Sequence, residues 1–223
     1  MAVYAVIPVK NLGATKKRLS AVFTPQERSQ LTLAMLEDVS HALQSSEVDE
    51  TVVVGEDSQV QRFAEKLGAT YLSATDAGLN TAIEKATSWC MQRAAASVLV
   101  LPADVPLITS KDVNRLLKLG TGGGAVVLSP SKNWGTNALL RSPPRLIPSC
   151  FGPKSFLNHI REAYQKGVSV RLYFSAGLAA DVDSAEDLKR LFDVENCTVC
   201  RKTLEKITLS SKKACDYFST KLC

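Results

Sequence analysis

The sequence has 223 residues, of which 45% are hydrophobic and 22% charged, and this composition fits a single globular domain with a full core. No apolar run approaches the roughly 18 to 20 residues needed to span a bilayer, so we expect no membrane partner. The 27 basic and 22 acidic residues leave a net charge of +5. This mild excess lies mainly in an N-terminal loop and the C-terminal tail. It suits an anionic small molecule, whereas nucleic-acid binders usually show a broader basic face, and we expect no nucleic-acid partner.

Strand and helix patterns alternate along the chain. Residues 3–9 are a continuous apolar run, as expected of a strand covered on both faces. A helix should begin at Pro25, because Thr24 and Glu27 form a capping box and apolar residues then recur at helical spacing. Those apolar residues are Leu31, Met35, Val39 and Leu43. Further strands are expected at 50–55, 69–73, 97–104, 125–130, 136–140 and 168–174, and further helices at 57–68, 79–95, 110–119, 153–166 and 184–192.

Helix caps support these assignments. Asp57 or Ser58 can cap the second helix, which Gly68 ends, and Ser110 can cap a later one. Several β-α units in series predict an α/β fold with a mostly parallel sheet between helices. Ligands of such sheets bind at the C-terminal ends of the strands, so we expect the functional residues at that edge.

Basic residues crowd the loop after the first expected strand. The stretch IPVKNLGATKKRLS, residues 7–20, carries Lys10, Lys16, Lys17 and Arg18 around Gly13. Like charges this close repel one another unless an anion lies among them, and such a loop can bind phosphates through backbone N–H and ammonium groups. The spacing is not that of a Walker A motif, and a solvated surface loop is the alternative. We leave Lys16 out of the expected ligands, because its side chain alternates away from Lys17 if the segment is extended.

Three aspartates are candidate metal ligands. Asp104 follows an apolar strand in the stretch LPADVPLIT, and Asp181 and Asp183 lie two positions apart in AADVDSAED. Residues at this spacing point the same way in an extended segment, and Mg²⁺ usually takes one or two protein carboxylates plus phosphate oxygens. Asp104 could instead be a turn residue, and Asp183 could cap the next helix together with Glu186.

Two glycine-containing stretches differ in what they indicate. In CFGPKSF, Gly152 and Ser155 resemble a helix start, where free N–H groups can bind an anion, although a plain capped helix is the alternative. The stretch GTGGGA at 120–125 contains a G-x-G-x-x-A pattern. We reject it as a dinucleotide fingerprint, because it follows a helix and opens a strand.

The C-terminal region carries most of the cysteines. We divide the chain into a domain at 1–194 and an appendage at 195–223, either helical or frayed. The N-terminus does not read as a signal peptide, so the six cysteines are most simply reduced thiols in a cytoplasmic protein. Cys197, Cys200, Cys215 and Cys223 could alternatively ligate zinc, although the last two are spaced outside usual geometry.

Six motifs in order resemble one known family. They are IPVKNLGATKKRLS, GLNTAI, LPADVPLIT, GTNALL, FGPKSF and DVDSAEDL, within residues 3–193. The series is similar to the 2-phospho-L-lactate guanylyltransferases of coenzyme F-420 biosynthesis. That resemblance implies a single-domain nucleotidyltransferase, glycosyltransferase-A-like and Rossmann-like. It also implies transfer of GMP from GTP to 2-phospholactate, phosphoenolpyruvate or 3-phosphoglycerate, with release of pyrophosphate.

The resemblance also implies roles for individual residues. Lys10, Lys17 and Arg18 would be catalytic cations, and Asp104, Asp181 and Asp183 would hold Mg²⁺ or Mn²⁺. The nucleotide would contact Pro8, Lys10, Gly13, Lys17, Arg18, Gly78, Leu79 and Asn80. The acceptor would contact Thr136, Gly152 and Ser155.

Other functions remain open at the level of sequence. A nucleotidyltransferase acting on a molybdopterin or sugar phosphate would share the basic loop and the acids. A glycosyltransferase could use the Asp181–Asp183 pair without releasing pyrophosphate, and a GTP-binding regulator would tolerate loss of Asp104. A homodimer is plausible because a strand edge and the tail are left over.

Overall fold

A computed structural model of the chain describes residues 1–14, 16–75, 78–122, 124–193 and 198–222. The strands are β1 Val3–Pro8, β2 Glu50–Gly55, β3 Thr70–Ser73, β4 Ser97–Val100, β5 Ala125–Pro130, β6 Thr136–Ser142 and β7 Ser169–Leu172. The helices are α1 Pro25–Gln44, α2 Ser58–Lys66, α3 Leu79–Gln92, α4 Ser110–Leu119, α5 Ser155–Gln165, α6 Ala176–Ala179, α7 Ala185–Lys189, α8 Val199–Ser210 and α9 Lys212–Leu222. Short 3₁₀ turns span Leu12–Ala14, Lys17–Leu19 and Arg190–Phe192.

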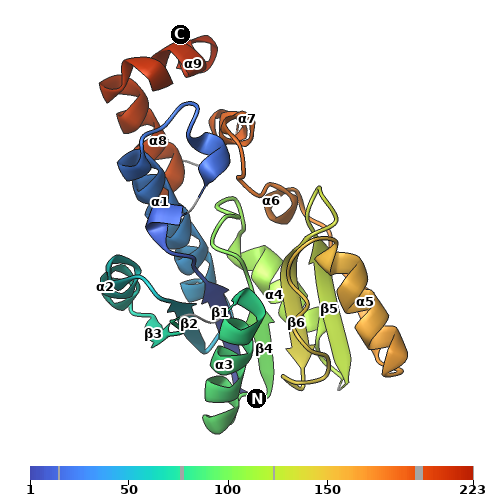
Figure 1. The fold of residues 1–223 in the computed structure, drawn as a ribbon. Coiled ribbons are helices and arrows are strands. Elements are labelled where there is room, and N and C mark those ends of the chain that lie inside the picture. The colour runs from blue at the N-terminus through green and yellow to red at the C-terminus, as the bar shows by residue number, and fades with distance from the viewer. Residues whose placement is uncertain (15, 76–77, 123, 194–197, 223) are drawn as a thin grey trace.

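The seven strands form one mixed sheet in the order β3-β2-β1-β4-β6-β5-β7. Only β6 runs antiparallel to its neighbours within this described sheet, which confirms the predicted mostly parallel α/β architecture. Figure 1 shows the sheet between helices, with the two chain ends far apart. The strand order reverses between β1 and β4, so their C-terminal ends frame a crevice.

Alternation along the strands builds a core on each face of the sheet. In β1, Ala5 and Ile7 pack with α1, α2 and α4, whereas Tyr4 and Val6 pack with α3 and α5. The stripe predicted for α1 is buried along its length, and the Thr24–Glu27 capping box is present. Each face of the sheet therefore has its own apolar contacts, which fixes the register of the strands.

A third core joins the basic loop, the segment containing the acids, and the tail. It includes Leu19, Met35, Val182, Leu188 and Leu204, all of which are buried. Helices α8 and α9 stack beyond α1 in Figure 1. Asp38 of α1 accepts hydrogen bonds from the backbone N–H groups of Val199 (2.7 Å) and Cys200 (2.8 Å), which caps α8. The C-terminal segment is thus helical and packed, and the boundary expected near residue 194 falls outside the described residues.

Several sequence expectations shift by a few residues. Thr109, and not Ser110, caps α4 through a capping box with Asp112, and Asp57 caps α2. Strand β4 ends at Val100, four residues before Asp104. No helix among the described residues is long and apolar enough to cross a membrane.

Candidate active site

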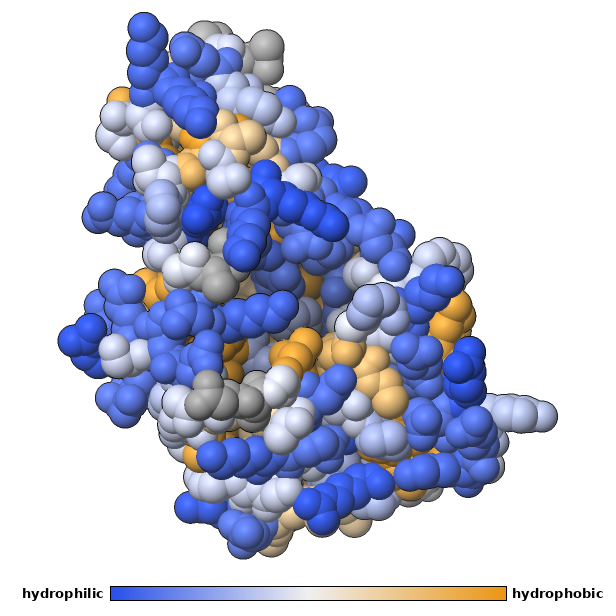
Figure 2. Space-filling view, in the orientation of Figure 1, coloured by the Kyte–Doolittle hydropathy of each residue, from blue (hydrophilic) through white to orange (hydrophobic). Residues whose placement is uncertain are grey.

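The basic loop and Asp104 meet because β1 and β4 are adjacent parallel strands. The loop leaves the C-terminal end of β1, and the segment containing Asp104 leaves the C-terminal end of β4. A cavity of about 480 Å³ opens between them. Its lining includes Lys10, Lys16, Lys17, Arg18, Asp104 and Asp183. Figure 2 shows the hollowed middle of this face, with hydrophilic residues around a few hydrophobic ones.

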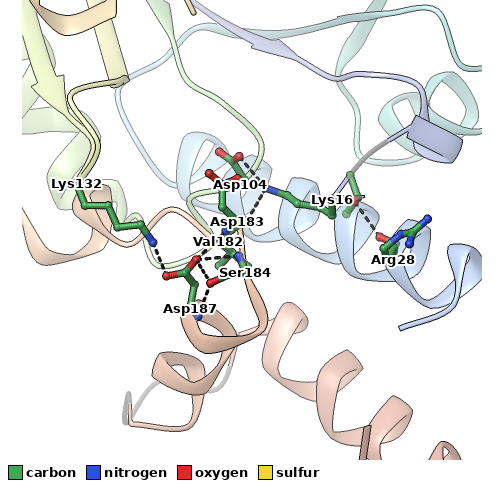
Figure 3. Close-up of polar contacts among 9 residues, drawn as sticks. Lys16, Arg28, Asp104, Lys132, Val182, Asp183, Ser184 and Asp187 are labelled. Carbon is green, nitrogen blue, oxygen red and sulfur yellow. Dashed lines mark hydrogen bonds and ion pairs between the residues drawn. The ribbon is translucent and has the colours of Figure 1, made fainter. Parts of the chain in front are cut away.

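Lys16 reaches the acids directly, contrary to the prediction that it points away. Its Nζ donates to Oδ2 of Asp104 (2.8 Å), to Oδ1 of Asp183 (3.3 Å) and to the carbonyl of Val182. Figure 3 shows the side chain extended toward both carboxylates. The prediction failed because the segment is not extended: Lys16 has φ 49° and ψ 42°, and a 3₁₀ turn follows it.

The buried ammonium of Lys16 is held in its charged form. Burial favours the neutral amine, but the negative charges of Asp104 and Asp183 and their hydrogen bonds outweigh it and raise the Lys16 pKa above its usual value. The Lys16 side chain is 10% exposed, so solvent screens these contacts little. Lys16 therefore balances the two carboxylates.

A backbone contact brings the three aspartates into one region. The N–H of Val182 donates to the carbonyl of Asp104 at 2.9 Å, which places the residues on either side of Val182 near Asp104. Asp181 is buried, and its Oδ1 has no hydrogen-bond partner among the described residues. Burial raises the Asp181 pKa, and the nearby charges of Asp104 and Asp183 add to this effect, while Lys132 opposes it.

The carboxylate oxygens of the three aspartates are the chemical type of ligand that a hard cation such as Mg²⁺ prefers. Carboxylates are ligands that Mg²⁺ accepts, and the unpartnered oxygen of Asp181 leaves one ligand uncommitted. As the side chains stand in the described part of the chain, no three His, Cys, Asp or Glu residues are grouped closely enough to hold a metal ion. The ammonium of Lys16 lies between Asp104 and Asp183 instead.

The alternative that Asp183 caps a helix is wrong by one position. Ser184 is the N-cap of α7, and its partner in the capping box is Asp187, not Glu186. Oδ2 of Asp187 accepts from the N–H groups of Asp183 (3.1 Å) and Ser184 (2.8 Å). The carboxylate of Asp183 is thus not used as a helix cap; it lines the cavity and pairs with Lys16, while its backbone is fixed by Asp187.

Lys132 completes this anchor from the hairpin between β5 and β6. Its Nζ donates to Oδ1 of Asp187, as Figure 3 shows. Burial alone would raise the pKa of Asp187, but the bonds from Lys132 and Ser184 lower it to about 2. The hairpin and the segment containing Asp183 are thus tied together through one carboxylate. The sequence signal for Asp187 is the Ser184-x-x-Asp187 spacing, one residue later than the predicted pair of Asp183 and Glu186.

Of the three residues predicted to contact the nucleotide near the start of α3, Leu79 lines the cavity and Asn80 binds the protein backbone instead. Leu79 lines the main cavity and an adjoining one, and Gly78 is the N-cap of α3. Asn80 instead clamps the backbone of Phe151: Oδ1 accepts from its N–H (2.7 Å) and Nδ2 donates to its carbonyl (3.0 Å). Because both polar atoms of Asn80 are engaged, this side chain positions Phe151, which lines the cavity.

Pro8 and Gly13, two other residues predicted to contact the nucleotide, differ in whether they line a cavity. Pro8 lines both cavities at the end of β1. Gly13 lies in a 3₁₀ turn, and its N–H donates to Oδ1 of Asn11 (2.9 Å). Gly13 lines neither cavity, and its contact with a nucleotide stays a prediction.

The predicted acceptor residues form a buried network. Thr136 Oγ1 lies 3.0 Å from Nδ1 of His159 and 3.1 Å from Oγ of Ser155. The N–H of Cys150 donates to Nε2 of His159 (2.9 Å), so Nδ1 carries the ring proton in neutral histidine and donates to Thr136. Burial and the positive charge of Arg141 lower the His159 pKa to about 4.

Neither Thr136 nor Ser155 lines the main cavity. Gly152 lies just before α5 with φ +134°, in the left-handed region that favours glycine. The structure brings these three residues together near Phe151, and their contact with an acceptor stays a prediction.

A cavity that gathers cations and carboxylates, at the point where the strand order of an α/β sheet reverses, is the arrangement expected of a nucleotidyltransferase. Residues 3–217 match the family model described as guanylyl transferase, CofC like, and the chain belongs to this family. The match extends beyond residue 193, so it includes much of the tail that the sequence motifs had left outside.

Curated relatives agree with this family. The chain is 43% identical over 192 residues to phosphoenolpyruvate guanylyltransferase of Rubrobacter xylanophilus, covering 86% of this chain and 94% of that protein. It is 37% identical to 2-phospho-L-lactate guanylyltransferase of Methanothermobacter thermautotrophicus, with coverage of 93% and 92%.

Solved structures support the fold at low sequence identity. A structure described as a nucleotide-diphospho-sugar transferase of Desulfovibrio desulfuricans has a TM-score of 0.78 at 15% identity, covering 97% of this chain and 99% of that one. A cytidylyltransferase of Leptospira borgpetersenii has a TM-score of 0.62 at 16% identity, with coverage of 96% and 97%.

Proposed function

We propose that this protein transfers GMP from GTP to the phosphate of a phosphorylated three-carbon acid in coenzyme F-420 biosynthesis. The acceptor is phosphoenolpyruvate or 2-phospho-L-lactate, which are the acids in the names of the relatives. The product with the second acid is lactyl-2-diphospho-5′-guanosine. The observation that carries the proposal is the cavity in which four cations face Asp104 and Asp183.

The reaction requires two anions to approach each other. An oxygen of the acceptor phosphate attacks the α-phosphorus of GTP, the bond from that phosphorus to the β-phosphate oxygen breaks, and pyrophosphate leaves with the electron pair. Lys10, Lys17 and Arg18 lie on the cavity wall, where they neutralise the triphosphate and the departing pyrophosphate. Lys16 joins this set once its ammonium leaves the acids.

We assign Mg²⁺, or Mn²⁺ in its place, to Asp104, Asp181 and Asp183. The bound ion supplies positive charge at the α-phosphate and helps to orient the acceptor. Support comes from the donor type and from the unpartnered buried oxygen of Asp181. Asp187 holds the backbone of Asp183 in place for this role.

Acceptor binding is assigned to Thr136, Gly152 and Ser155. Because His159 donates to Thr136 Oγ1, the Thr136 hydroxyl hydrogen is left to donate elsewhere. A phosphate or carboxylate oxygen of the acceptor can accept it once the surrounding segment adjusts. Phe151 lines the main cavity, so an acid bound at these residues would lie next to the nucleotide.

Pyrophosphate release tests the reaction. The purified protein is mixed with Mg²⁺, each nucleoside triphosphate in turn, and phosphoenolpyruvate, 2-phospholactate or 3-phosphoglycerate. We expect release only with GTP and one of these acids, and a loss of about 10²-fold or more in Asp104→Asn. Asp216→Asn makes the same chemical change at an exposed position in α9 and should leave the rate unchanged.

Other outcomes identify other functions. Release with GTP and a sugar phosphate or molybdopterin, but none of the three acids, would indicate a different nucleotidyltransferase. GTP binding without release in any mixture, retained in Asp104→Asn, would indicate a regulator.

We further propose a cytoplasmic homodimer. The described cysteines Cys90, Cys150, Cys200 and Cys215 are free thiols, as in a reducing compartment, whereas Cys197 and Cys223 of the alternative zinc site lie outside the described residues. Strand β7 is a sheet edge, and the apolar side chains of Leu172, its last residue, and of Phe174, just after it, are exposed. Light scattering of the purified protein tests the dimer, and a monomer at micromolar concentration would exclude it.

A further inference from the structure

A second hollow adjoins the main cavity beside the ends of β1 and β2. It has a volume of about 250 Å³ and shares Pro8, Val9, Lys10 and Leu79 with the main cavity. Its remaining lining is Asn11, Val54, Gly55, Glu56, Ala74 and Ala82. The charged wall of the main cavity suits the triphosphate, so the smaller, mostly apolar hollow suits the base.

Small residues give this hollow its shape. A Cβ at Gly55 would lie 2.5 Å from the carbonyl oxygen of Val9, so only glycine allows β2 to approach the loop after β1 this closely. Val54, Ala74 and Ala82 are buried and contribute apolar surface. A flat purine can pack against such walls without leaving buried polar groups unpaired.

Glu56 stands at the rim on a backbone that is fixed on both sides. The carbonyl of Gly55 accepts from the N–H of Ala74 (2.8 Å). On the other side, Asp57 caps α2, and its Oδ2 accepts from the N–H of Leu12 (3.0 Å). The position of Glu56 is therefore set by neighbouring strands and helices, and not by its own side chain.

The carboxylate of Glu56 is uncommitted. It makes no hydrogen bond or ion pair with any of the residues that the structure describes. The other polar side chain in the lining besides Lys10 is Asn11, whose Oδ1 already accepts from Gly13. Glu56 is thus the acceptor among the described lining side chains that is available to a ligand.

We propose that Glu56 selects guanine by accepting hydrogen bonds from N1–H and the N2 amino group. These adjacent donors match the two oxygens of one carboxylate. Adenine presents an amino donor beside the N1 lone pair, which would face the carboxylate unfavourably. The inference rests on the proposed use of GTP and adds the residue that distinguishes GTP from other nucleotides.

Glu56→Gln tests the proposal, because it should lower the affinity for GTP and raise the affinity for XTP. A glutamine offers one acceptor and one donor, which match N1–H and the O2 oxygen of xanthine. In calorimetric titrations with Mg²⁺, the wild type should bind GTP more tightly than ITP, which lacks the N2 amino group, and bind XTP weakest. The variant should lose about 10- to 100-fold in GTP affinity and gain at least about tenfold for XTP.

Glu65→Gln is the matched control. It removes the same charge from an exposed glutamate on α2 outside both cavities, and its nucleotide preference should equal that of the wild type. The gain for XTP separates altered recognition from poor folding, because a damaged protein would bind every nucleotide less well.

The outcomes separate this inference from the proposed function. Unchanged GTP preference in Glu56→Gln, without a gain for XTP, overturns the role of Glu56, as does a wild type that binds GTP, ITP and XTP equally. Guanine selection through Glu56 with no pyrophosphate release on any of the acids supports the inference and rejects the proposed acceptors.

Discussion

Lys16 and Asp104 are 88 positions apart in the sequence, and their side chains meet at 2.8 Å in a partly buried contact. The contact also includes Asp183, so one ammonium compensates two carboxylates that would otherwise repel each other. Lys16 therefore compensates the charge of these acids, and we expect the proposed Mg²⁺ to take its place when the nucleotide binds.

Replacing Lys16 with methionine tests this exchange. The variant leaves Asp104 and Asp183 uncompensated, so we expect a lower melting temperature without metal and a larger rise on adding Mg²⁺ than in the wild type. We also expect the transfer rate to fall by about 10²-fold or more, because a charge stabiliser is lost. Thermal scans with and without Mg²⁺, and pyrophosphate release, measure the two effects.

A control for the Lys16 variant is Lys111→Met on α4, which lies outside the main cavity. It should show neither effect. An Mg²⁺ response in Lys16→Met no larger than that of the wild type would contradict the exchange.

Asp187→Asn should disturb the acids from outside the cavity. The substitution removes the charge pair with Lys132 and weakens the acceptor that fixes the backbone of Asp183. We expect a loss of about 1–3 kcal/mol in unfolding free energy and a several-fold rise in the Mg²⁺ concentration for half-maximal rate. The KM for GTP should change little, because the basic loop is untouched.

Glu186→Gln lies on the same short helix, at a carboxylate that pairs only at the surface with Lys189 among the described residues. It should leave both the Mg²⁺ dependence and the stability nearly unchanged. An equal Mg²⁺ shift in the two variants would mean that Asp187 does not position Asp183.

The lowered pKa of His159 should make the stability of the protein depend on pH. Its pKa is about 4 in the folded protein, against an ordinary value of 6.5, so the unfolded chain binds the proton more readily. The stability that depends on neutral His159 is fully present above about pH 6.5 and is lost as the pH falls toward 4. The loss amounts to about 3 kcal/mol at most. Urea unfolding at several pH values measures it.

The second histidine provides the control. In His159→Gln the slope between pH 6.5 and 4 should flatten. His41 is exposed on α1, and His41→Gln should keep the wild-type slope. Identical slopes in all three proteins would assign the acid sensitivity to other groups.

Asp38→Asn should loosen the tail. At the start of α8, two backbone N–H groups donate to the two carboxylate oxygens of Asp38. An asparagine would replace one of these oxygens with an amide nitrogen, which cannot accept the hydrogen bond. We expect a loss of about 1 kcal/mol or more and faster tryptic cleavage within α8. Glu37→Gln changes the neighbouring charge without touching that cap, and equal cleavage of both variants would show that Asp38 does not hold the helix.

Local patterns in the sequence determined most of the secondary structure and the architecture. Thr24 with Glu27 set the start of α1, the apolar spacing set its buried face, and alternating β-α units indicated the mostly parallel sheet. The motifs also named the basic loop and the three aspartates, because residue type and position after a strand are local properties. These features depend on neighbours within a few residues, which the sequence shows directly.

Only the tertiary structure decided how the site is assembled. The direction of Lys16 depends on a left-handed backbone angle and on the buried cluster that includes both Leu19 and Val182. The engagement of Asn80 with Phe151, and the link from Asp187 to Lys132, join segments 71 and 55 positions apart. Such contacts follow from strand order and packing across the whole chain, so no local pattern contains them.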